Sequence, residues 1–149
     1  MFPTELRQHE VPFSGSIRPI QTSDLSLLKP ILETWIRDSE THELLTEELE
    51  STLQAMEESI SGKNDRTYFV AVTQDGNVVG SMGMRTPDPR LLQYVTTGKP
   101  IELVNAFVSK DYRRQGTGQA LVHTIEKEAK QKGYTELIMD SGPRYKFTG

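Results

Sequence analysis

In the N-terminal half of the chain, the spacing of the apolar residues is typical of one short strand followed by two helices. A strand is predicted at residues 16–20, and a helix follows because residues 22–24 (TSD) offer an N-cap ahead of leucines at helical spacing. Pro30 lies inside this helix and is expected to kink or interrupt it. A second helix is predicted from Thr41 to Ile60, with apolar residues on one face and glutamates on the other. The glutamates are typical of a solvated helix face, and a cation-binding surface is the alternative.

A hairpin of two strands is predicted after the second helix. Residues 67–73 (TYFVAVT) are rich in β-branched and aromatic residues, residues 75–77 (DGN) are a turn signal, and residues 78–85 form the return strand. Gly80 and Gly83 in the return strand indicate a bulge or a close approach by another part of the molecule. A weak, bent strand is the alternative.

The last third of the chain predicts a strand, a polar turn, a helix and another strand. A long loop at 86–100, which either faces a substrate or is disordered, leads into an apolar strand at 101–108. A glycine-containing turn follows at 109–118, then a helix at 117–132 and a strand at 134–140. The two strands are expected to be near-parallel, with a right-handed crossover between them.

Length and composition limit the classes of protein that fit. The 149 residues allow one domain, predicted at 15–149 behind an irregular lead-in at 1–14. A net charge of -4 argues against a nucleic-acid partner and slightly favours a cationic or amine-bearing substrate. The sequence has no cysteine, which excludes disulfides, thiolate zinc sites and a cysteine nucleophile. Neither a secretory signal nor an apolar run of the ~20 residues that span a bilayer is visible, so a cytoplasmic protein without a membrane partner is expected.

The turn at residues 113–118 (RRQGTG) has the chemistry of a phosphate-binding loop. The first amides of a helix lack intrahelical acceptors, and the helix dipole adds about half a positive charge there. Gly116 and Gly118 would let a bulky anion approach these amides, while Arg113 and Arg114 add two positive charges with bidentate reach. The P-loop and the dinucleotide fingerprint are rejected, because their lysine and their third glycine are missing. A pyrophosphate is the ligand that this turn suits best.

Residues 108–121 (VSKDYRRQGTGQAL) resemble motif A of the GNAT superfamily of acyl-CoA-dependent N-acetyltransferases. The family pattern is Arg or Gln, two residues, Gly, one residue, then Gly or Ala, and Arg113, Gly116 and Gly118 meet it after an apolar strand. With the flanking elements, the resemblance covers most of residues 15–140. It implies an α/β (α+β) fold with a mixed, mainly antiparallel central sheet and helices on both faces.

The resemblance also implies how acetyl-CoA would bind. In such proteins the backbone amides of the motif hold the CoA pyrophosphate. Carried onto this chain, the cofactor-binding residues of the turn are Arg113, Arg114, Gln115, Gly116, Thr117 and Gly118. The pantetheine arm pairs with the strand before the turn, here about Phe107 and Val108. The amide of Val108 would then donate to the thioester oxygen and stabilise the oxyanion that forms there.

A general base is expected, because a primary amine with a pKa of about 10.4 must lose a proton before it attacks the thioester. Glu102 is the predicted base. Two-residue alternation places it on the same strand face as Val108, and its spacing resembles that of the glutamate base in the histone acetyltransferase branch. The alternative is a strand-end glutamate that points into solvent. Asn105, Tyr94 and Asp140 are lesser candidates for the base.

Proteins of this family continue past the strand at 134–140 into a helix whose tyrosine protonates the leaving thiolate, and then into two more strands. The sequence ends at Gly149, so this C-terminal part is expected to be missing, and Tyr145 precedes the expected tyrosine position. A truncated chain, completion by another subunit and weak CoA binding are the three open explanations. The missing part also carries much of the acceptor site, so the acceptor class stays open.

The sequence predicts acetyl transfer from acetyl-CoA to a primary amine of a small molecule or protein, by direct attack in a ternary complex. It suggests no metal, and a homodimer is compatible with it. The alternative is a non-catalytic acyl-CoA-binding or interaction module with the same fold. A purely structural α/β domain, which would bind no CoA, is the third hypothesis.

Overall fold

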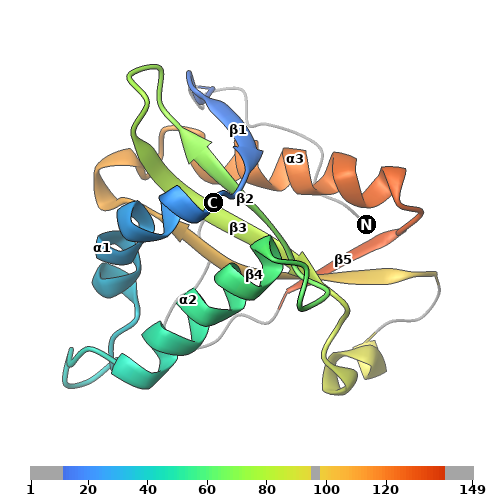
Figure 1. The fold of residues 1–149 in the computed structure, drawn as a ribbon. Helices are drawn as coiled ribbons and strands as arrows, with labels where there is room; N and C mark the ends of the chain where they lie inside the picture. The colour runs from blue at the N-terminus through green and yellow to red at the C-terminus, as the bar shows by residue number, and fades with distance from the viewer. Residues whose placement is uncertain (1–11, 95–97, 140–149) are drawn as a thin grey trace.

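A computed structural model of the chain describes residues 12–94 and 98–139 (Figure 1). Within these residues the five strands and three α-helices predicted from the sequence are all present, together with three short 3₁₀ turns. In chain order the elements are β1 (Ser16–Pro19), η1 (Thr22–Asp24), α1 (Leu25–Trp35), α2 (Thr46–Ile60), β2 (Thr67–Val72), β3 (Val78–Arg85), η2 (Pro89–Tyr94), β4 (Pro100–Val108), η3 (Lys110–Tyr112), α3 (Thr117–Gln131) and β5 (Glu136–Met139).

The strands form one sheet in the order β1-β2-β3-β4-β5. The first three pairings are antiparallel, whereas β4 and β5 run parallel, from Pro100↔Glu136 to Leu103↔Met139. Parallel neighbours need a crossover, which α3 provides between β4 and β5. The predicted mixed, mainly antiparallel sheet is confirmed.

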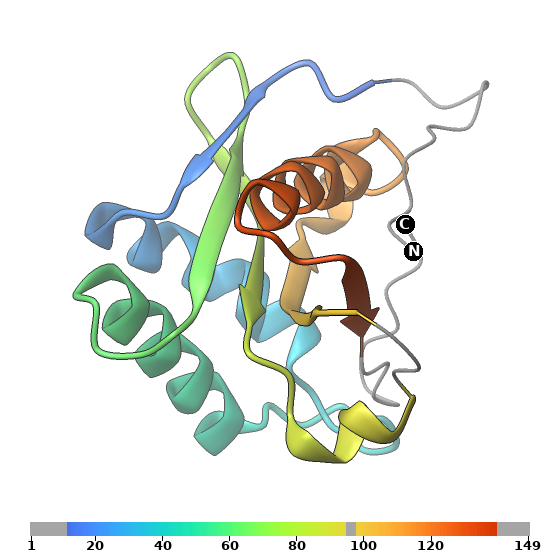
Figure 2. The same cartoon turned by 90° about the vertical axis from the view of Figure 1, so that its right-hand side faces the viewer.

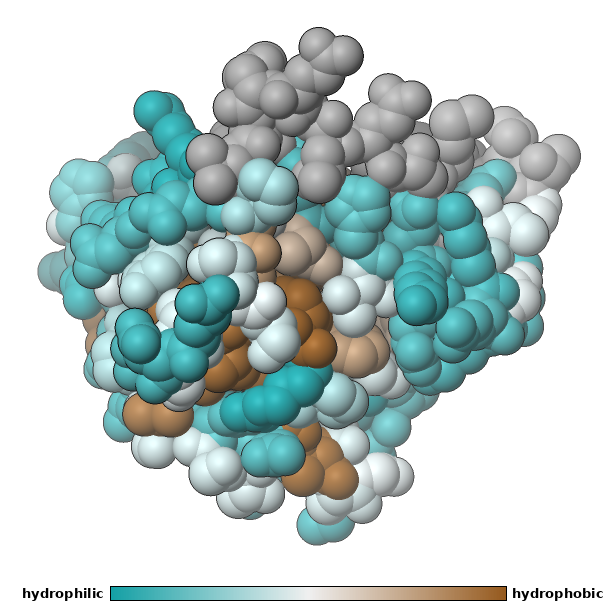
Figure 3. All heavy atoms as spheres, turned by 90° about the horizontal axis from the view of Figure 1, so that it is seen from above, coloured by the Kyte–Doolittle hydropathy of each residue, from teal (hydrophilic) through white to brown (hydrophobic). Residues whose placement is uncertain are grey.

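Helices cover both faces of the sheet, as predicted: α3 packs on one face, and α1 and α2 pack on the other (Figure 2). The core on the α3 face consists of Phe69, Ala71, Val79, Met82, Met84, Ile101, Leu103, Leu121, Val122, Ile125 and Ala129. The core on the opposite face consists of Leu28, Leu32, Ile36, Leu49, Met56, Tyr68, Val70, Val78 and Phe107. Successive residues of β2 alternate between the two cores, as the pleat of a strand requires. Polar side chains cover most of the end of the molecule that Figure 3 shows.

The helix α2 begins at Thr46, later than the predicted start at Thr41. The carboxylate of Asp38 accepts hydrogen bonds from the amides of Glu40 and Thr41, both at 2.9 Å. Side-chain acceptors of this kind compete with helical pairing of the backbone. The segment predicted as the first turn of the helix therefore forms a tight loop.

Of the two effects predicted for Pro30, an interruption is wrong, because the helix α1 continues through this residue, and a kink stays a prediction. Leu28 and Leu32, on either side of Pro30, have no exposed surface. Their packing against the sheet outweighs the single backbone hydrogen bond that a proline cannot donate.

The described part of the structure does not test every prediction made from the sequence. Most of the lead-in at 1–14 and the strand end at Asp140 lie outside the described residues. None of the helices described is long and apolar enough to cross a membrane. The cytoplasmic location and a homodimer stay predictions.

Candidate cofactor and catalytic site

The turn between β4 and α3 brings the predicted phosphate-binding residues to the N-terminus of α3. Gly116 is the N-cap of this helix and has a φ of 77°. This left-handed conformation accounts for a glycine at that position, because a residue with a Cβ is strained there. The first turn of α3, which is 15 residues long, presents its unpaired amides and the positive end of its dipole here. The arrangement has the features that bind an anion.

Two kinds of side chain surround these amides. Arg113, Arg114 and Gln115 are exposed, which leaves the two guanidinium groups at the surface of the turn. Thr117 is buried, and its hydroxyl donates to the carbonyl of Tyr112 at 3.3 Å. A buried hydrogen bond therefore holds the turn in place, while its exposed surface carries positive charge.

Trp35, at the end of α1, is a site residue that the sequence pattern did not indicate. Its indole Nε1 donates to the carbonyl of Val108 at 2.8 Å. The guanidinium of Arg113 lies 5.0 Å from the centre of its ring, and the ammonium of Lys110 lies 5.5 Å from it. Both distances are in the range of cation–π attraction. No local pattern could have found Trp35, because 73 positions separate it from Val108.

The register of β3 and β4 fixes where the backbone of Val108 points. The amide of Ser109 donates to the carbonyl of Val79 at 2.8 Å, and only alternate residues of an antiparallel ladder bond to the neighbouring strand. Val108 therefore directs its amide and carbonyl away from β3. Phe107 directs its backbone toward β3 and buries its side chain. Of the two residues predicted to pair with the pantetheine arm, Val108 directs its amide to the side away from β3, where its carbonyl accepts from Trp35.

A bulge interrupts β4 before it reaches Val108. Asn105 and Ala106 stand opposite the single residue Met82 of β3, and Asn105 has a left-handed φ of 51°. An extra residue of this kind reverses the alternation of faces beyond it. Val108 packs against the core on the α3 face, whereas Glu102 points to the opposite face. The expectation that Glu102 and Val108 share a face is therefore wrong.

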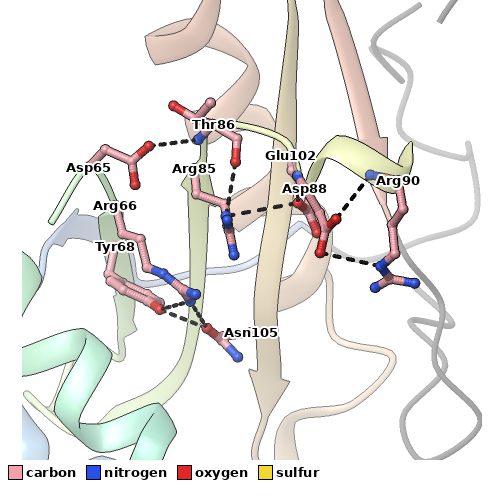
Figure 4. A network of polar contacts seen from close by, with 9 residues as sticks. All are labelled: Asp65, Arg66, Tyr68, Arg85, Thr86, Asp88, Arg90, Glu102 and Asn105. Atoms are coloured by element: carbon pink, nitrogen blue, oxygen red, sulfur yellow. Dashed lines mark hydrogen bonds and ion pairs between the residues drawn. The ribbon is translucent and has the colours of Figure 1, made fainter. Parts of the chain in front are cut away.

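Glu102 is buried, with 6% of its surface exposed, so the alternative that it points into solvent is also wrong. Its Oε1 atom accepts a hydrogen bond from the amide of Asp88 at 2.9 Å and lies 3.9 Å from Nε of Arg85 (Figure 4). These contacts hold the carboxylate in one place beside β4. Its role as general base stays a prediction.

A second polar group lies on the same face of the sheet (Figure 4). The hydroxyl of Tyr68 donates to Oδ1 of Asn105 at 2.6 Å, and Nη1 of Arg66 donates to both, at 3.0 and 3.1 Å. Burial raises the pKa of Tyr68, with Arg66 acting in the opposite direction, so the hydroxyl is a protonated donor at neutral pH. Asn105 thus accepts hydrogen bonds through its side chain. The side chain of Tyr94 and the whole of Asp140, the other lesser candidates, lie outside the described residues.

A hollow of about 670 Å³ opens at the C-terminal end of α1. Its walls include Asp38, His42, Lys110 and Trp35, the residue whose indole donates to the carbonyl of Val108. The hollow is mixed in polarity and charge. Residues 12–94 and 98–139 contain no group of three or more His, Asp or Glu side chains that could hold a metal ion.

Comparison with known proteins decides the family. The model of the Acetyltransferase (GNAT) family matches residues 29–144, which is most of the chain. The chain belongs to the GNAT acetyltransferase family.

Solved structures share the GNAT fold. PaiA N-acetyltransferase from Thermoplasma acidophilum, in complex with coenzyme A, is 22% identical with a TM-score of 0.65, over 89% of this chain and 82% of that one. AAC(6')-Iy, in complex with the bisubstrate analogue CoA-S-monomethyl-acetylneamine, is 18% identical with a TM-score of 0.65, over 86% of this chain and 80% of that one. At these identities the likeness shows the fold alone, because one fold can host many functions.

Curated relatives of this GNAT domain are N-acetyltransferases. N-acetyltransferase 8 of Homo sapiens is 37% identical over 76 residues, which are 50% of this chain and 31% of that protein. N-acetyltransferase family 8 member 7 of Mus musculus is 26% identical over 118 residues, which are 78% of this chain and 50% of that protein. The chain thus spans between about a third and a half of the length of these relatives.

Proposed function

We propose that this GNAT domain transfers an acetyl group from acetyl-CoA to a primary amine, by direct attack in a ternary complex. The observation that carries the proposal is the glycine turn at the N-terminus of α3, placed directly after a strand whose last residue turns its backbone away from β3. The turn suits a pyrophosphate, and the strand suits a peptide-like arm such as pantetheine. The fold shared with a protein crystallised with coenzyme A supports this choice of cofactor.

In the proposed complex the cofactor lies along β4. The amides of residues 114–118 bind the pyrophosphate, with Arg113 beside them. The pantetheine arm then passes Val108 and runs back along the strand toward Glu102. Pairing of β4 with the described part of β5 covers Pro100 to Leu103, so the arm meets the stretch of β4 beyond that pairing.

The distance along β4 decides which residues act on the thioester. Glu102 and Val108 are six positions apart on the strand, a distance of about 20 Å at about 3.3 Å per residue. A general base acts at about 3 Å or through one water, so Glu102 and the amide of Val108 cannot act on one carbonyl. We place the thioester at Asn105 and Ala106, where the bulge sets two residues of β4 against one residue of β3. Val108 then binds the arm instead of the reacting carbonyl, which revises the sequence-based assignment.

The proposed reaction needs one proton acceptor and one stabilised oxyanion. The neutral amine attacks the thioester carbon, the carbonyl becomes a tetrahedral oxyanion, and a backbone amide of the bulge donates to it. The C–S bond then breaks, giving the N-acetyl amine and a CoA thiolate that takes up a proton. Glu102 accepts the proton of the amine through a water molecule, a role that suits a carboxylate held beside the strand by the amide of Asp88.

Amine-dependent release of free thiol from acetyl-CoA tests the proposal. A panel of a diamine, a lysine-containing peptide, an amino acid and an aminoglycoside samples the main classes of primary amine. The proposal predicts release that saturates in both substrates for at least one class. The alternative, a non-catalytic CoA-binding module, predicts acetyl-CoA binding with no release above the amine-free blank.

A further inference from the structure

Three side chains connect the bulge of β4 to β2, the next strand but one. They are Tyr68, Arg66 and Asn105, joined by hydrogen bonds of 2.6 to 3.1 Å. The ring of Tyr68 crosses the strand between them at Gly83, where a Cβ atom would lie only 2.6 Å from two ring carbons. The absence of a side chain at position 83 is what lets the hydroxyl of Tyr68 reach Asn105.

The bulge depends on these contacts because its conformation is unfavourable for most residues. Asn105 has a φ of 51°, a left-handed conformation that is unfavourable for an ordinary residue and that asparagine tolerates better than most. Its Oδ1 atom accepts from two donors, one of them the cationic Arg66. Hydrogen bonds from a charged donor are stronger than neutral ones, which fixes the side chain and with it the backbone of Asn105.

We propose that Tyr68, Arg66 and the side chain of Asn105 form a positioning network that sets the bulge, and through it the separation of the thioester carbonyl from Glu102. The inference rests on the proposed function. Tyr68 is 1% exposed, so it acts through Asn105 and does not touch the substrate. The three hydrogen bonds of the network involve no residue of the pyrophosphate turn, which follows Val108 in the chain.

Tyr68→Phe is the most selective test, since it keeps the ring over Gly83 and removes only the hydroxyl. We expect kcat to fall by about 10- to 100-fold, because displacing a reacting group by about 1 Å has an effect of that size. The KM for acetyl-CoA should stay within about twofold of the wild-type value, because the turn at residues 113–118 is unchanged. Asn105→Ala should lower kcat at least as far.

Rescue and non-additivity separate positioning from a general loss of structure. Asn105→Asp keeps an acceptor oxygen and tolerates a left-handed φ, so it should retain more activity than Asn105→Ala. Adding Tyr68→Phe to Asn105→Ala should change kcat little further, since the two act through one contact. Ile17→Ala, on β1 and packed against the core on the α3 face, is the control that lowers stability and leaves kcat unchanged.

The inference is overturned if Tyr68→Phe lowers the thermal midpoint while kcat stays at the wild-type value. A wild-type domain that acetylates none of the amines refutes the proposed function instead. Hydrogen exchange of the Ala106 amide, measured without ligand, then decides the inference separately. Exchange at least about tenfold faster in Tyr68→Phe supports the network, and an unchanged rate contradicts it.

Discussion

At the scale of the residue, two glycines of β3 are explained by what lies against them. A Cβ at Gly83 would lie 2.6 Å from the ring of Tyr68, and a Cβ at Gly80 would lie 2.9 Å from the carbonyl oxygen of Phe107. The close approach predicted from these glycines is confirmed, and a shift in register beside Gly83 accompanies it. Both contacts involve the strands that build the site.

Gly83→Ala is expected to destabilise the domain by about 1–3 kcal/mol, the usual cost of overpacking a core. The added methyl group must displace the ring of Tyr68, which is buried and hydrogen-bonded. Urea unfolding measures the effect. In a Tyr68→Leu background the same substitution should cost less, and an equal cost in both backgrounds would show that the ring is not the obstacle.

Glu102→Gln is expected to lower kcat by about 10²- to 10⁴-fold, the size of a general-base contribution, with the Kd for acetyl-CoA unchanged. Steady-state kinetics and calorimetry give the two quantities. Glu126→Gln is the matched control, because Glu126 is equally buried but lies on α3, where it pairs with Lys130. Equal activity in Glu102→Gln and the wild type would remove Glu102 from the mechanism.

At the scale of the element, an ion pair fixes how β1 leads into α1. The terminal nitrogens Nη1 and Nη2 of Arg18 donate to the carboxylate of Asp24, at 2.8 and 2.9 Å, and the amide of Gln21 donates to it at 2.7 Å. Burial alone would raise the pKa of Asp24, but the hydrogen bonds from Arg18 and Gln21 outweigh it and hold the pKa below its usual value. Asp24 therefore favours the folded state while it is ionised.

The contribution of Asp24 to stability should depend on pH in one direction. Because its folded pKa is lowered, the stabilisation is present above the unfolded pKa of about 3.9 and is lost as the pH falls through the folded value. Asp24→Asn should cost about 1.5–3 kcal/mol at neutral pH, and the difference from wild type should shrink in acid. Urea unfolding of both proteins, at neutral and at acid pH, measures the difference in their free energies of unfolding. A difference that is constant with pH would contradict the assignment.

The elements themselves were largely predictable, because each follows from local pattern. The strand β3 has the predicted bounds, and the helix α3 ends one residue before the predicted end. The bulge of β4 was not predictable, since IELVNAFV reads as an uninterrupted strand and the extra residue is defined only by pairing with β3. That one residue reversed the face assigned to Glu102 relative to Val108. The start of α2 was missed because a carboxylate at position 38 competes for the backbone amides.

At the scale of the whole molecule, the fold collects the candidate site from distant parts of the sequence. The pyrophosphate turn was predictable, since all its residues lie together between β4 and α3. Trp35 and Tyr68 were not, because they reach β4 from 73 and 37 positions away. Glu102 and the bulge lie on β4, and the pyrophosphate turn follows the end of this strand.

Calorimetric titration of the folded domain with acetyl-CoA tests the central claim most directly. The partner is a double variant, Arg113→Ala with Gly116→Glu, which removes one cation and places an anion at a left-handed position of the turn. The account predicts saturable 1:1 binding to the wild type and a loss of at least about tenfold in affinity in the folded variant. The absence of binding to the folded wild type, or equal affinity in the two proteins, would contradict it.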